Sequence, residues 1–123
     1  MTDYKNELSK LLIKLNLSPA LYGYDLIIEA VNMYCNRPKN QRFSMTDTYR
    51  RIAAETKPGT VSHVERCIRT AITSMFLHNT THVNDDLIKE IFGDNAFLSD
   101  HISNAAFVAC LGIYLTTHNV KDI

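Results

Sequence analysis

The chain has 123 residues, of which 46% are hydrophobic, as is typical of one globular domain with a buried core. Thirteen basic and thirteen acidic residues give a formal net charge of zero, so the overall balance does not indicate a polyanionic partner. The longest apolar run, residues 105–115, is too short to span a bilayer, and the polar N-terminus does not resemble a signal peptide. We therefore expect a single cytoplasmic domain over residues 1–123, without a membrane partner.

Apolar residues recur at helical spacing in six segments, and no segment alternates as a strand would. The first two segments run from Asp3 to Leu15 and from about Pro19 to Cys35, with Ser18 as the expected N-cap of the second. Gly23 predicts a break or a close contact near the start of that second helix. The three cysteines all lie within helical patterns and are expected to be reduced packing residues: Cys35, Cys67 and Cys110.

The centre of the chain predicts a helix-turn-helix. Amphipathic patterns from Met45 to Thr56 and from Thr60 to Leu77 are joined by Lys57-Pro58-Gly59. In such a motif the second helix enters the major groove of DNA. Either Thr60 or Ser62 suits its N-cap, since Ser62 and Glu65 also have the spacing of a capping box. Its polar side carries hydrogen-bonding groups and two arginines: Ser62, His63, Arg66, Arg69, Thr70 and Thr73.

Two further helices are expected near the C-terminus. One runs from Asp85 to Phe92, capped by Asn84 and ended by Gly93, and Ser103 opens the last, which runs to about Thr117. Between them and the central pair, His78 and His82 are four residues apart, but no cysteine or carboxylate cluster completes a ligand set, so no metal is expected. The predicted fold is an all-α compact bundle of about six helices containing the helix-turn-helix.

Charge is unevenly distributed along the chain. Residues 37–69 contain eight basic and three acidic side chains, whereas the remainder contains five basic and ten acidic ones. The polar loop of residues 36–43 contributes three of these positive charges, Arg37, Lys39 and Arg42, and is expected to lie along a phosphate backbone. A cationic third on an anionic body is typical of polyanion binding, although a solvated charged face gives the same pattern.

The segment V-E-R-C-I-R-T-A-I, residues 64–72, resembles the recognition helix of a known family. That family is the C-terminal DNA-binding effector domain of the stage-zero sporulation response regulator, whose helix reads S-R-V-E-R-A-I-R-H-A-I. Weaker similarities occur in the right order around Gly23-Tyr24, at Ile91-Phe92-Gly93, and at Ser103-Asn104 with Phe107-Val108-Ala109. The resemblance covers about Leu8 to Leu115.

The resemblance implies a six-helix fold that reads a short box resembling TGTCGAA, often with domains in tandem on adjacent boxes. It assigns base reading to Glu65, Arg66 and Arg69. Arginine can pair with guanine and glutamate can accept from cytosine, although Glu65 also fits a role as a cap or in orienting an arginine. The expected DNA-backbone contacts are Lys57, Thr60, Ser62, His63, Thr70, Arg37, Lys39 and Arg42.

Three features depart from the family pattern. His63 replaces the arginine before V-E-R and has a shorter reach, which puts one contact and the preferred box in doubt. The chain starts with Met and lacks the family's receiver domain, so we expect either a lone effector domain or a fragment. The last helix is apolar on nearly all faces, which predicts a homodimer through Phe107, Leu111, Tyr114 and Leu115.

These observations favour a sequence-specific regulator of transcription that binds double-stranded DNA in the bacterial cytoplasm, associated with the nucleoid, and needs no cofactor. RNA polymerase remains open as a further partner. The alternative is a protein-binding helical module that dimerises with, or antagonises, a full-length regulator. An enzyme using Cys67 or a histidine is not favoured, because no set of nucleophile, base and orienting group is visible.

Overall fold

The computed structural model describes residues 3–56, 59–79, 84–93 and 102–118. These residues form six α-helices and no strand, which confirms the predicted all-α fold. None of the helices in these ranges is long and apolar enough to cross a membrane. The helices are α1 (Lys5–Lys14), α2 (Tyr22–Asn36), α3 (Met45–Glu55), α4 (Val61–His78), α5 (Asp85–Phe92) and α6 (Asn104–Thr117).

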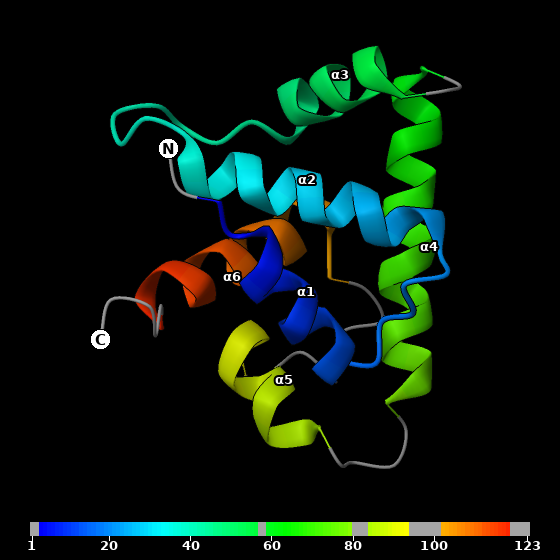
Figure 1. Cartoon of the computed structure of the whole chain (residues 1–123), viewed down its shortest axis with the longest axis vertical. Coiled ribbons are helices and arrows are strands. Elements are labelled where there is room, and N and C mark those ends of the chain that lie inside the picture. Colours follow the sequence, from blue (N-terminus) through cyan, green and yellow to red (C-terminus); the bar gives the residue numbers. More distant parts are fainter. Residues whose placement is uncertain (1–2, 57–58, 80–83, 94–101, 119–123) are drawn as a thin grey trace.

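Helix α2 lies at the centre and packs mainly against α4 and α6. Helix α3 lies across one end of α4 and contacts both α4 and α2, whereas α5 packs on α6 (Figure 1). The apolar stripe predicted for the central segment is the buried face of α4, where Val64, Ile68, Ala71, Ile72 and Met75 are fully covered. This burial anchors α4 along its whole length and leaves its polar side outward.

Side-chain caps set the starts of three helices. Ser44, Thr60 and Ser103 each accept a hydrogen bond from the backbone N–H three residues later, at 3.1–3.2 Å. Thr60, and not Ser62, is therefore the N-cap of α4. Two other expected caps are corrected. Helix α2 begins at Tyr22 and not at Pro19, since Ser18 Oγ accepts from the N–H of Ala20 in a turn that precedes the helix. At the start of α5, the side chain of Asn84 makes no capping hydrogen bond.

Gly23 marks a close contact between α2 and α4, one of the two outcomes its position predicted. A Cβ atom there would lie 2.2 Å from the backbone oxygen of Cys67 and 2.8 Å from Cβ of Ala71. Gly112 of α6 is similarly close to α2, but its neighbour is the ring of Tyr34. At Gly23 the neighbouring backbone leaves no room for a side chain, whereas at Gly112 the neighbour is a side chain.

Three asparagines join the C-terminal ends of α1 and α4 to the start of α5. The buried amide of Asn79 donates to the carbonyls of Leu15, at 2.7 Å, and Met75, at 2.8 Å. Its oxygen accepts from Asn84 at 2.7 Å and from Asn16 at 3.2 Å. The asparagine cluster (Asn16, Asn79 and Asn84) thus satisfies carbonyls that the helix ends leave open.

Most of the residues expected at a dimer interface on α6 are buried within their own chain. Phe107, Leu111 and Leu115 are 0%, 0% and 7% exposed, because α6 packs against α2 and α5 within the core of its own chain. Tyr114 is half-buried and stacks on His118 with ring centroids 4.3 Å apart. The apolar character of this helix is therefore explained by the core, and only Ile113 remains a large exposed hydrophobic side chain on it.

Cys35 should react slowly with alkylating agents in the folded protein. Burial raises the pKa of its thiol to about 11, and Sγ donates weakly to the carbonyl of Gly112 at 3.8 Å. Since only the thiolate reacts, a pKa raised by two units from 9.0 lowers the rate at pH 8 by about a hundredfold. Iodoacetamide labelling followed by mass spectrometry measures this rate, which should rise about tenfold per pH unit between pH 8 and 10.

The control for this experiment is the same chain in denaturant, where all three thiols should label rapidly. Equal labelling rates for Cys35 in the folded and unfolded chains would contradict its burial.

Candidate nucleic-acid interface

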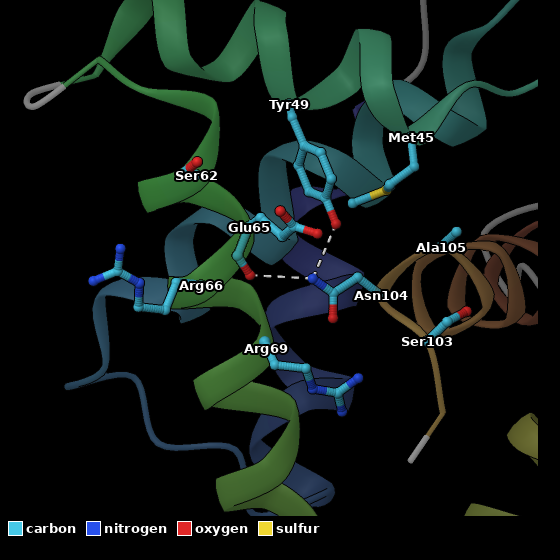
Figure 2. Close-up of a pocket in the computed structure, with 9 residues that line it drawn as sticks. All are labelled: Met45, Tyr49, Ser62, Glu65, Arg66, Arg69, Ser103, Asn104 and Ala105. Atoms are coloured by element: carbon cyan, nitrogen blue, oxygen red, sulfur yellow. Dashed lines mark hydrogen bonds between the residues drawn. The ribbon is translucent and has the colours of Figure 1, made fainter.

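The three residues predicted to read bases lie near the capped N-terminus of α4, Glu65 and Arg66 side by side in the sequence and Arg69 about one turn later. Glu65 and Arg66 are exposed, and Arg69 is half-buried. Arg66 extends from one side of the helix and Arg69 from the other, towards α6 (Figure 2). The sequence places them there because the apolar positions of α4 face the core, which forces the intervening residues outward.

Arg66 is available for a ligand. Among the residues that the structure describes, no carboxylate or carbonyl pairs with its guanidinium. A guanidinium presents donors in a planar fork that matches the acceptors of a phosphate or of a guanine edge. Glu65, one position earlier, adds a carboxylate acceptor that lies on the side of Tyr49 and Asn104 (Figure 2). The capping-box role considered for Glu65 is wrong, since Thr60 caps the helix.

Arg69 is engaged by its own chain. Its Nη1 donates to the carbonyl oxygen of Ile102 at 2.5 Å, across 33 residues of sequence. Its Nε is buried and has no partner within the described part of the chain. The partner is a backbone carbonyl, and among the described residues no carboxylate pairs with Arg69.

A groove between α3, α4 and the start of α6 adjoins these side chains, and we call it the α4–α6 groove. Its lining consists of Met45, Tyr49, Ser62, Glu65, Arg66, Arg69, Ser103, Asn104 and Ala105. The amide of Asn104 donates to the hydroxyl of Tyr49 at 2.9 Å and to the carbonyl of Glu65 at 3.1 Å (Figure 2). Burial raises the pKa of Tyr49, so this hydroxyl stays protonated at neutral pH.

The α6 side of this groove was not predicted. In the sequence, the Ser103-Asn104 pair matches a family pattern that gives it no role. An asparagine directly after a helix cap, followed by an apolar helix, is a signal that such a residue is buried and bonded to another element.

His63 faces α2 and lines a small groove together with Arg66. Its ring is half-buried, 5.8 Å from that of Tyr22, and its Nε2 lies 3.6 Å from Sγ of Cys67. These residues and Thr70 border this groove, which is smaller than the α4–α6 groove. In the described ranges, no group of three or more potential metal ligands occurs, and His82 lies outside those ranges.

The predicted backbone-binding residues form two separate groups. Thr60, Ser62 and Thr70 are exposed on α4 near Arg66, although the hydroxyl oxygen of Thr60 is used by its cap. Lys57 falls outside the described residues. The second group belongs to the loop after α2, at the opposite end of α2 from its contact with α4 (Figure 1). Helix α2 has 15 residues, which separates the two groups by roughly 20 Å.

The loop group is itself divided. Lys39 and Arg42 are exposed. Arg37 is held by its own chain, since Nη1 donates to the Tyr34 carbonyl at 2.8 Å and Nε donates to the Gln41 carbonyl at 3.2 Å. Its guanidinium also lies over the Tyr34 ring, 4.0 Å from the centroid. Arg37 therefore stabilises the shape of the loop, whereas Lys39 and Arg42 expose their positive charges to solvent.

Comparison with known families agrees with this geometry. The family model described as "Sporulation initiation factor Spo0A C terminal" matches residues 8–115, which is most of the chain. No curated protein and no solved structure shows significant similarity. The family is one of DNA-binding regulator domains and not of enzymes. The chain therefore belongs to the Spo0A C-terminal family, the DNA-binding effector domains of sporulation regulators.

Proposed function

We propose that α3 and α4 form a helix-turn-helix and that α4 reads base edges in the major groove of double-stranded DNA. The observation that carries this proposal is the exposed guanidinium of Arg66, which has no partner among the described residues, on a helix whose opposite face is buried. Arg66 and Arg69 supply donors for guanine, and Glu65 supplies an acceptor for cytosine. The preferred site is a box resembling TGTCGAA, occupied singly or in tandem.

Phosphate contacts on both sides of α4 would provide affinity. Ser62 and Thr70 are exposed near the base-reading side chains, and Lys57 precedes the helix. The N-terminus of α4 adds unpaired N–H groups and a positive dipole end that suit a phosphate oxygen. Affinity from such contacts should fall steeply as salt rises, because bound cations are released from the duplex.

Selection of binding sites from a random duplex library tests the function and reports the box at once. Enrichment of one short motif would support sequence-specific reading. Absence of any enriched motif, together with tight association with a full-length regulator, would favour the alternative role as a protein-binding module.

Arg66→Ala should weaken binding to the selected box by about 1–3 kcal/mol, because it removes a base contact. Binding to an unrelated duplex should change much less, so the ratio of the two affinities should fall. Fluorescence anisotropy with both duplexes at two salt concentrations measures this ratio.

Lys10→Ala is the matched control for charge. Lys10 is exposed on α1, and its removal changes the net charge by the same amount. It should leave the affinity ratio unchanged. If Arg66→Ala and Lys10→Ala behave alike, Arg66 does not read bases.

A further inference from the structure

The start of α6 touches both helices of the proposed reading motif. Asn104 is 8% exposed, and its amide nitrogen bonds the hydroxyl of Tyr49 on α3 and the carbonyl of Glu65 on α4 (Figure 2). One side chain therefore fastens α6 to α3 and to α4 at the same point. The orientation of the two helices relative to each other is fixed there by direct hydrogen bonds.

The hydrogen bond from Asn104 to the Glu65 carbonyl lies next to the side chains proposed to read bases. Its acceptor is the backbone carbonyl of the residue whose carboxylate is proposed to read a base, directly before Arg66. Rotation of α4 about its axis would move this carbonyl away from the buried amide of Asn104 and break the hydrogen bond. The direction in which Glu65 and Arg66 point is therefore linked to the position of α6.

Ile102, two positions before Asn104, contacts Arg69. The carbonyl of Ile102 holds Nη1 of Arg69, so the same short segment orients a second proposed base-reading side chain. An arginine oriented before it binds loses less conformational freedom on forming its contact. The start of α6 thus touches the backbone or side chain of two of the three proposed base readers.

We propose that Asn104 is a positioning residue for DNA reading. It does not touch the DNA; it sets the rotation of α4 relative to α3 and thereby the aim of Glu65 and Arg66, while the adjoining Ile102 carbonyl orients Arg69. This inference rests on the proposed function of α4.

Asn104→Ala tests the inference, and Asn79→Ala is its matched control. Both residues are buried asparagines whose amides donate to two oxygens, but Asn79 lies at the opposite end of α4. Both changes should lower the midpoint of thermal unfolding. Affinities for the selected box and for a scrambled duplex are then measured at a temperature where each variant is folded by circular dichroism.

Asn104→Ala should lower the ratio of specific to non-specific affinity about tenfold, the size of one weakened base contact, with little change on the scrambled duplex. Asn79→Ala should leave the ratio unchanged. Tyr49→Phe keeps the buried ring and removes only the hydroxyl, so it should lower the ratio in the same direction by a smaller factor. It serves as the test if Asn104→Ala does not fold.

A measurement without DNA separates the positioning of α4 by Asn104 from the proposed reading of DNA by α4. Backbone amide chemical shifts from Ser62 to Thr70 should move in Asn104→Ala and stay in place in Asn79→Ala. An unchanged affinity ratio in folded Asn104→Ala, or an equal fall in Asn79→Ala, would overturn the positioning role. If the wild-type chain shows no preference for any duplex, the proposed function itself fails, even where the chemical shifts move as expected.

Discussion

Phe107→Ala should lower the free energy of unfolding by about 3–5 kcal/mol, the range typical of a buried phenylalanine. The side chain is fully buried in α6, and its ring stacks on Phe92 with centroids 5.0 Å apart. Truncation would remove this contact and leave a cavity between α5 and the core. Urea denaturation followed by circular dichroism gives the change in stability.

The same residue was predicted from sequence to form a dimer interface, so this variant also distinguishes the two roles. Ile113→Ala is the control on the same helix, since Ile113 is 53% exposed and its loss should change stability little. A Phe107→Ala protein of unchanged stability but altered mass by light scattering would show that the ring contacts a second copy.

Gly23→Ala should have the second largest effect, a loss of about 3 kcal/mol, at the upper end of what overpacking costs. The added Cβ would lie 2.2 Å from the backbone oxygen of Cys67, so α2 and α4 would have to separate. The obstacle is backbone in the middle of a helix and has no rotamer to adopt. The midpoint of thermal unfolding reports the loss.

Gly112→Ala is the matched comparison. Its Cβ would lie 2.2 Å from the ring of Tyr34, which is only half-buried and can turn aside. Alanine also gains about 1 kcal/mol of helix propensity at this interior position. The loss should therefore be clearly smaller than for Gly23→Ala. Equal losses at both positions would mean that the contact with α4 is no tighter than the contact with Tyr34.

Most of the fold follows from local patterns. The stripe of apolar residues from Val64 to Met75 specifies the buried face of α4, and the caps at Thr60 and Ser103 fix where two helices start. The start of α2 was placed too early, because Ser18 and Pro19 have the chemistry of a helix start but form a turn instead. Local chemistry cannot distinguish these outcomes when both satisfy the same backbone groups.

The candidate site was only partly predictable, for a physical reason. Helical spacing alone places Glu65 and Arg66 outward, since it depends on neighbours within two turns. The bond between Arg69 and Ile102 joins residues far apart in sequence, and so does the pairing of Asn104 with Tyr49. Such contacts depend on how helices pack. The apolar surface of α6 showed the same limit, because burial in its own core and burial against a partner require the same residues.

The asparagine cluster at the C-terminal end of α4 affects which partner, the protein or the DNA, would change shape in a complex. Asn79 holds the C-terminal end of α4 by bonds to two carbonyls, Gly23 of α2 packs closely against its middle, and Asn104 bonds a carbonyl near its N-terminus. These contacts restrain α4 along its length. The DNA duplex, and not α4, would then have to deform when the two bind. Boxes flanked by easily kinked pyrimidine–purine steps should be accommodated at less cost than stiff adenine tracts, even where no side chain reaches those flanks.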